Sequence, residues 1–210
     1  MAGINVAAAS ITQDVIAEAA LKILELEGPD ALSLRRVGEQ LGTSHVTVYR
    51  RCESFTGLLE VCANYVAADF PLVPSDMEWA GATQARFEAA YEMWAEHADL
   101  VLLMRGRAWQ GENIMTRFYE PCMQTLLGAG MSIHSAAKLF SVLHRMTIGS
   151  VILTKANDWS PWEARKAIAA LGEDRVPALA RVQREVEWSD LRAIYRDTLR
   201  RLISDLGPAS

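Results

Sequence analysis

The sequence predicts an all-α protein with two domains. Apolar residues recur three and four positions apart, which is typical of one face of a helix, and no convincing strand-like alternation occurs. Half of the 210 residues are apolar and 22% are charged, which excludes a disordered chain. This length is enough for one sizeable domain or two small ones with a hydrophobic core.

Hydroxyl side chains and glycines delimit four helices in the first 70 residues. Each helix follows a residue that can cap its first turn: Thr12, Ser33, Ser44 and Ser54. Gly28 and Gly42 end the first two helices, the third runs to about residue 51, and the fourth ends near residue 69. Two prolines follow, at positions 71 and 74, and we take them as the domain boundary.

The rest of the chain predicts helices over residues 76–97, 99–108, 112–127, 132–155, 160–171 and 189–206. The apolar stretch Leu139 to Leu153 is interrupted by His144 and Arg145, so we expect a buried helix there rather than a membrane span. Residues 1–10 have no positive charge before their apolar stretch, so we expect a tail rather than a secretory signal. We therefore expect a soluble, cytoplasmic chain.

Residues 33–49, SLRRVGEQLGTSHVTVY, predict a helix-turn-helix in which Gly42 gives the tight turn. The second helix of such a unit enters the major groove with its N-terminal residues nearest the bases. Those residues are Ser44, His45, Val46 and Thr47, and Tyr49, Arg50 and Arg51 lie one turn later, where phosphates are expected. An ordinary helical hairpin with a glycine turn explains this segment equally well when it is taken alone. The first helix, the basic end of the third helix and the segment 54–59 together favour DNA binding.

This arrangement resembles the N-terminal domain of the tetracycline-repressor-like (TetR/AcrR) family of bacterial regulators, over roughly residues 11–60. The resemblance rests on Gly28, Leu32-Ser33-Leu34, Val37, Leu41-Gly42, Ser44, Thr47-Val48-Tyr49-Arg50 and Leu58-Leu59. It implies a helix-turn-helix domain over 11–53, a connecting helix over 54–70 and an effector-binding and dimerisation domain over 71–210. The family's DNA contacts fall on Ser33, Arg35 or Arg36, His45, Val46, Thr47, Tyr49 and Arg51.

Four positions depart from the family's pattern. The family usually has an apolar residue at Thr43, glycine at Val46, phenylalanine at Cys52 and a phosphate-binding lysine at Phe55. The missing lysine removes one expected phosphate contact, although the dipole of the fourth helix can still face a phosphate.

The net charge of −5 argues against a nucleic-acid partner until it is examined by region. Residues 1–70 contain five Lys and Arg against nine Asp and Glu, but four of those five cations lie between positions 35 and 51. Association depends on the local potential rather than on the net charge, so these cations can still favour DNA. We expect few phosphate contacts per N-terminal DNA-binding domain (the headpiece, residues 11–53), and we expect the affinity for DNA to rely strongly on dimerisation.

The second domain contains all six tryptophans and all but one of the methionines, as an adaptable apolar pocket would. Each of these residues, taken singly, is more often a core residue. The resemblance implies an effector pocket, whose candidates are Trp94, His97, Met104, Trp109, Met115, Phe118, Tyr119 and Met123. It also implies a homodimer in which the last two long helices form a four-helix bundle. The interface candidates are Ala136, Phe140, Leu143, Thr147, Leu191, Tyr195, Leu199 and Leu202.

No catalytic or metal-binding pattern is evident in the sequence, and we expect no cofactor. Glu88, Glu92 and Glu96 recur every four residues but lack the accompanying Glu-x-x-His pairs of a di-iron bundle, so we expect a solvated face. We expect Cys52, Cys62 and Cys122 to be buried thiols rather than redox sensors. The leading hypothesis is a homodimeric repressor that a small, apolar or aromatic effector releases from a palindromic operator. An all-α enzyme and a helical protein-interaction module that has lost DNA binding are the alternatives.

Overall fold

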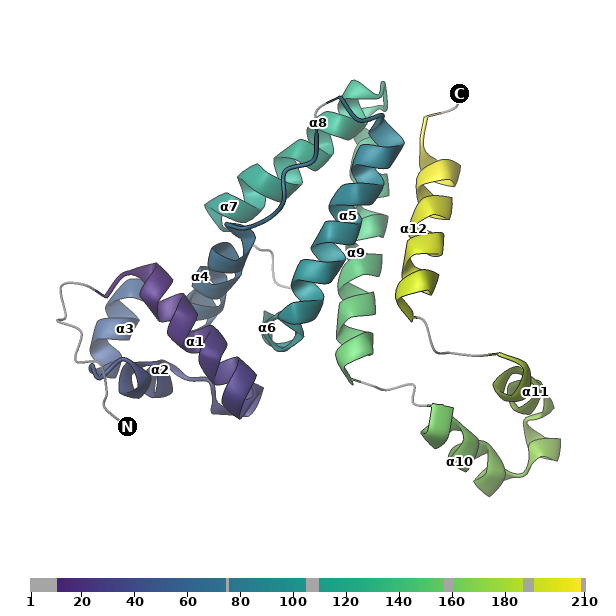
Figure 1. The fold of residues 1–210 in the computed structure, drawn as a ribbon, viewed down its shortest axis with the longest axis horizontal. Helices are drawn as coiled ribbons and strands as arrows, with labels where there is room; N and C mark the ends of the chain where they lie inside the picture. The colour runs from purple at the N-terminus through teal and green to yellow at the C-terminus, as the bar shows by residue number, and fades with distance from the viewer. Residues whose placement is uncertain (1–10, 75, 105–109, 157–160, 187–190, 209–210) are drawn as a thin grey trace.

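The computed structural model describes residues 11–74, 76–104, 110–156, 161–186 and 191–208, and every regular element within these ranges is helical. Figure 1 shows a small group of helices, α1 to α4, joined through α4 to a larger group in which α5, α9 and α12 run side by side. The prediction of an all-α fold is confirmed.

The first group contains α1 (Gln13–Glu27), the 3₁₀ turn η2 (Pro29–Ala31), α2 (Leu34–Gln40), α3 (His45–Cys52) and α4 (Phe55–Ala67). All four predicted caps form, because Thr12, Ser33, Ser44 and Ser54 each accept a hydrogen bond from a backbone N–H in the first turn of the helix that follows. Gly28 and Gly42 have φ angles of 83° and 65°, which favour glycine and turn the chain sharply after α1 and α2.

The second group contains α5 (Trp79–Glu96), α6 (Ala98–Met104), α7 (Glu112–Ile114), the π-helical turn η3 (Met115–Tyr119), α8 (Glu120–Gly128), α9 (Ile133–Ala156), α10 (Pro161–Leu171), the 3₁₀ turn η4 (Glu173–Arg175), α11 (Pro177–Glu185) and α12 (Leu191–Leu206). Helix α5 begins three residues later than predicted, because Glu78 accepts hydrogen bonds from the backbone N–H groups of Ala80 and Gly81. Helix α11 was missed by the sequence analysis.

The predicted helix over 112–127 is not regular, because η3 interrupts it. The N–H of Glu120 donates to the carbonyl of Met115, five residues earlier, instead of four. Pro121 gives the physical reason: it has no N–H to donate, and in a regular α-helix its ring would clash with the carbonyl of Arg117. The wider turn directly before Pro121 avoids this clash.

The core of the second group lies between α5, α9 and α12. Phe87, Leu143 and Leu199 are fully buried there. The ring of Tyr195 stacks on that of Tyr91 with centroids 4.4 Å apart, and its hydroxyl lies 2.9 Å from the carbonyl oxygen of Phe87, to which it donates. Helix α12 is thus fixed to α5 by both packing and hydrogen bonding.

Helix α9, with 24 residues, is the longest of the described helices. Its segment Ile133–Thr154 is long and apolar enough to cross a membrane, with a mean hydropathy of 1.3, and 28% of that window is buried in the subunit. The helix packs against α5, α6, α8 and α12, as a core helix does. Much of its apolar surface nevertheless stays uncovered in a single chain.

Candidate nucleic-acid interface and ligand cavity

Helix α3 exposes one face to solvent and anchors the other. Val48 and Cys52 are buried, whereas His45, Val46, Tyr49, Arg50 and Arg51 are exposed. Val46 and Tyr49 keep 45% and 54% of their surface exposed, although the bodies of both side chains are apolar. We call these five exposed residues the α3 surface. It offers hydrogen-bonding, apolar and cationic groups on one rigid helix.

Two glycines that the sequence analysis did not single out fix the position of α3. A Cβ atom on Gly38 would lie 3.1 Å from both the backbone nitrogen of His45 and the carbonyl oxygen of Thr43, so α2 meets the start of α3 at backbone distance. A Cβ on Gly57 would lie 1.9 Å from the carbonyl oxygen of Cys52, so α4 also meets the end of α3 at backbone distance. Glycines at helical positions near a turn are the signal that could have identified them.

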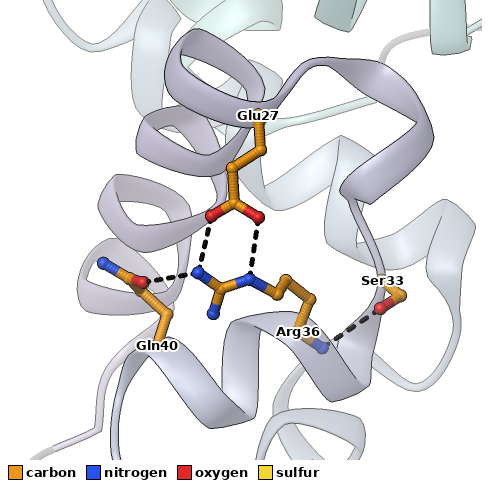
Figure 2. Close-up of polar contacts among 4 residues, drawn as sticks. All are labelled: Glu27, Ser33, Arg36 and Gln40. Atoms are coloured by element: carbon orange, nitrogen blue, oxygen red, sulfur yellow. Dashed lines mark hydrogen bonds and ion pairs between the residues drawn. The ribbon is translucent and has the colours of Figure 1, made fainter.

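Arg36 holds the helix-turn-helix against α1, as Figure 2 shows. Its guanidinium donates to both carboxylate oxygens of Glu27, at 3.0 and 2.5 Å, and to the side-chain oxygen of Gln40 at 3.1 Å. The hydrogen bond from Arg36 lowers the pKa of the Glu27 carboxyl, and the same bond raises the pKa of Arg36. The guanidinium therefore joins α2 to α1, and the DNA contact expected of Arg36 stays a prediction.

The remaining predicted DNA-binding residues divide by what their side chains already contact. Ser33 and Ser44 are exposed and act as helix caps, and the hydroxyl of Thr47 lies 3.2 Å from those of both Thr43 and Ser44. The side chain of Arg35 is 83% exposed and pairs with Glu39 on its own helix. Among the described residues, no carboxylate pairs with Arg50 or Arg51, so their charges are directed to solvent.

A small aromatic cavity lies where the end of α4 meets the second group of helices. It is lined by Ala67, Phe70, Met93, Trp94, Ile114, Phe118, Tyr119 and His144. Phe118 is its central residue, with ring centroids 5.3 Å from Phe70 and 5.4 Å from Phe87. Burial and the neighbouring Arg145 lower the pKa of His144, so this imidazole is neutral at pH 7. The lining therefore offers aromatic faces and no formal charge.

The cavity is closed in this conformation. The space open to the centre of a water-sized sphere is about 10 Å³, which is room for about one water molecule. Pockets that hold drug-sized ligands usually have roughly 300–1,000 Å³. A ligand larger than water must therefore move the lining residues apart.

The structure places the predicted pocket residues in different surroundings. Trp94, Phe118 and Tyr119 line the cavity, and Met104 is buried in the core. Three lie elsewhere: His97 lines two open grooves beside α1, Met115 is 47% exposed, and the half-buried Met123 is not part of the cavity lining. Trp109 lies outside the described residues. Ala67 and Phe70, which the sequence places in the connecting helix, also line the cavity.

Most of the predicted interface residues pack inside the subunit. Five of them are buried against other helices of the same chain: Ala136, Leu143, Thr147, Tyr195 and Leu199. Phe140 and Leu202 are half-buried, and Leu191 is 43% exposed. Helical spacing identified the apolar faces of α9 and α12 but could not say which strip faces the subunit's own core.

The three cysteines are buried, as expected, and burial raises the pKa of Cys52 to about 11 and those of Cys62 and Cys122 to about 12. Such thiols carry almost no thiolate at neutral pH and react slowly. Among the described residues, no group of three or more His, Cys, Asp or Glu side chains could hold a metal ion.

The chain matches known proteins along most of its length. Residues 70–206 match the family model described as "Tetracyclin repressor-like, C-terminal domain". The HTH-type transcriptional repressor DrrR1 of Streptomyces coeruleorubidus is 29% identical over 108 residues, a match that covers 50% of this chain and 40% of that repressor, less than half of its length.

Two solved structures of ActR from Streptomyces coelicolor share the whole architecture. Apo ActR is 25% identical with a TM-score of 0.79, over 93% of this chain and 94% of that one. ActR in complex with (S)-DNPA is also 25% identical, with a TM-score of 0.80, over 93% of this chain and 96% of that one. The match to the family model covers more than half of the sequence, and the members of this family are transcriptional regulators rather than enzymes. The chain therefore belongs to the tetracycline-repressor-like (TetR) family of DNA-binding transcriptional regulators.

Proposed function

We propose that this chain is a cytoplasmic, homodimeric repressor that binds palindromic operator DNA through the α3 surface and is released when an uncharged aromatic effector enters the cavity. The observation that carries the DNA-binding part is the geometry of α3. Its buried side is fixed by Val48 and Cys52, while its exposed side presents His45 and Tyr49 next to two arginines directed to solvent. A helix held in this way can enter the major groove without rearranging.

A binding-site selection tests this proposal. The full-length chain is incubated with a random pool of double-stranded DNA at about 0.15 M salt, and the selected sequences are checked by gel shift, because salt strongly affects such affinities. We expect a palindrome whose half-sites lie about one helical turn, or a multiple of it, apart. Selection of no sequence, with binding equal to that of scrambled DNA, would contradict the function.

His45→Ala tests which residue reads bases. His45 is exposed in the first turn of α3, where side chains meet base edges, so we expect its removal to broaden the selected half-site rather than abolish binding. Lys22→Ala, an exposed change on α1, is the matched control and should select the same sequence as the parent. An unchanged preference in His45→Ala would remove this residue from the base-reading set.

The aromatic lining supports an uncharged aromatic effector. Phe70, Phe118 and Tyr119 supply ring faces and edges, and the neutral imidazole of His144 stacks on Phe140 at 5.6 Å. A buried carboxylate or ammonium on the ligand would find no opposite charge among the lining residues, and burying an unpaired charge is costly.

Titration calorimetry with naphthalene, 2-naphthol and anthraquinone tests the cavity. We expect at least one of these probes to bind and, in a separate gel shift, to weaken operator binding. Ala67→Leu adds bulk to a wall of the cavity, because Ala67 lines it and is only 2% exposed. The variant should reject the probes. Equal probe binding by the parent and by Ala67→Leu would place the effector site elsewhere.

Uncovered apolar surface on the last long helices supports the dimer. Leu153 on α9 is 61% exposed, and Leu191 and Ile194 on α12 are 43% and 47% exposed. Pairing these faces across a two-fold axis gives a four-helix bundle and positions two α3 surfaces over one palindrome. Light scattering should give twice the chain mass of 23.2 kDa for the parent, and Ile194→Glu should shift it toward the monomer. A monomeric parent at micromolar concentration would contradict the dimer.

A further inference from the structure

Helices α4 and α7 are joined by two asparagines beside the cavity. The backbone N–H of Asn113 donates to Oδ1 of Asn64 at 2.8 Å, and Nδ2 of Asn113 donates to the backbone carbonyl of Asn64 at 3.0 Å. Each side chain therefore bonds the main chain of the other residue. We call this pair of hydrogen bonds the Asn64–Asn113 clamp.

The clamp satisfies a backbone donor that α7 cannot satisfy itself. The N-cap of α7 is Gly111, which has no side chain to accept a bond from the first-turn N–H groups. Oδ1 of Asn64 performs that role from another helix. A Cβ atom on Gly111 would lie 2.4 Å from Oδ1 of Asn64, so the glycine is what leaves room for the clamp.

The clamp also satisfies a backbone acceptor at the end of α4. In a regular helix the N–H of Ala68 would bond the carbonyl of Asn64, but here it donates to the carbonyls of Tyr65 and Val66. The carbonyl of Asn64 is thereby released, and the side chain of Asn113 donates to it. The two helix ends thus complete each other, which fixes their relative position.

Both segments that leave the clamp line the cavity. Ala67 at the end of α4 and Phe70 just after the helix follow Asn64, and on the other side Phe118 and Tyr119 of η3 follow Asn113. Because the cavity is closed, a ligand that enters it must separate these two walls. The clamp joins the walls at one end, so it is placed to act as their pivot.

We propose that the Asn64–Asn113 clamp is the hinge through which opening of the cavity moves α4 and, with it, the DNA-binding helices. Helix α4 packs on α1 and α3, so a tilt of α4 is passed directly to the headpiece. The π turn η3 is the part of the cavity wall that moves, because its wider hydrogen-bonded loop can change register without breaking the clamp. This hinge rests on the proposed function, since it couples that operator site to that cavity.

Coupling between two binding sites is reciprocal, so the hinge can be tested without knowing the effector. Operator binding should alter the cavity wall as much as the wall alters operator binding. We would measure amide hydrogen exchange over residues 111–119 of the full-length chain, with and without an operator obtained by selection. The parent should show a change of about fivefold or more in exchange rate, at the lower end of usual allosteric couplings.

Four variants separate the hinge from general effects on stability. Asn64→Ala removes both the acceptor and the fit around Gly111, and Asn113→Ala removes only the bond to the Asn64 carbonyl. Asn64→Asp keeps an acceptor for the N–H at the start of α7 and should preserve the response. Tyr65→Phe is the matched control, because it removes the neighbouring hydrogen bond from the Tyr65 hydroxyl to Glu18, 2.7 Å long, within the headpiece.

The hinge predicts that the operator-induced change persists in Tyr65→Phe and Asn64→Asp and disappears in both alanine variants, while all four bind operator. A full response in Asn64→Ala and Asn113→Ala would overturn the hinge, as would a parent that binds operator with unchanged exchange over 111–119. A parent that selects no DNA would overturn the proposed function instead, so the two failures are distinguishable.

Discussion

The α3 surface and the cavity differ in whether they must rearrange before they can bind a partner. The side chains of the α3 surface are exposed on a helix whose cap, turn and close glycine contacts are all formed, so the surface can bind without rearrangement. The cavity is closed around Phe118 and has room for about one water molecule. In the proposed function, operator binding therefore needs no rearrangement of the chain, whereas effector binding must be accompanied by a conformational change.

This difference has a thermodynamic consequence. A ligand that opens the cavity shifts the equilibrium only by its differential affinity for the open and closed states. A hundredfold weakening of operator binding would require about 2.7 kcal/mol of coupling, which is within the usual allosteric range.

Phe118→Ala should have the largest effect, because Phe118 is 5% exposed and packs against five aromatic rings or imidazoles around the cavity. We expect a loss of about 3–5 kcal/mol in the free energy of unfolding, measured by tryptophan fluorescence in denaturant. Met115→Ala, on the same turn but 47% exposed, should stay within about 0.5 kcal/mol of the parent. Equal losses in the two variants would contradict the closed cavity.

Arg51→Ala and Tyr49→Ala should weaken operator binding in distinguishable ways. Removing the charge of Arg51 should weaken binding to all sequences and reduce the salt dependence by about two units of slope, one for each protomer of the proposed dimer. Tyr49 carries no charge, so its removal should weaken binding while leaving the slope nearly unchanged. Fluorescence anisotropy at several salt concentrations measures both quantities. If both variants bound like the parent, the α3 surface would be assigned wrongly.

Glu27→Gln should have a smaller, pH-dependent effect. Because Arg36 lowers the pKa of Glu27, the ion pair stabilises the fold above the ordinary carboxyl pKa of 4.5, and this contribution is lost as the pH falls through the lowered value. The melting temperature of Glu27→Gln should therefore lie below that of the parent at pH 7 and converge with it in acid. Glu39→Gln, which breaks the exposed pair with Arg35, should show little difference at either pH.

The rate at which the cysteine thiols are alkylated should show the smallest effect. With pKa values of about 11 for Cys52 and about 12 for Cys122, neither thiol should react with iodoacetamide at pH 7.5 in the folded chain. Saturation with an aromatic probe that opens the cavity should speed alkylation of Cys122, one turn beyond Tyr119, and leave Cys52 protected. Mass spectrometry of the alkylated peptides measures this, and faster labelling of Cys52 would contradict a preformed headpiece.

The two regions also differ in how far the sequence predicts them. In the headpiece, the order of helices follows from local signals: a hydroxyl before each helix and glycines after the first two. The pairing of Arg36 with Glu27 could not be predicted, because it depends on how α1 crosses α2. In the second domain, periodicity found the apolar faces, but whether Tyr195 or Ile194 faces the core is decided by packing between distant helices.

The turn η3 also sets the register of the helix that follows it. A π turn contains one residue more than an α turn, and each residue of a helix turns the next by about 100°. The extra residue is thus absorbed within the turn, and Cys122 and Leu126 of α8 keep facing the core. Deleting a single residue between positions 115 and 119 would close the turn to an ordinary α turn and leave the inner face of α8 in place. The loss would be felt at Pro121 instead, whose ring would then meet the carbonyl oxygen four residues before it.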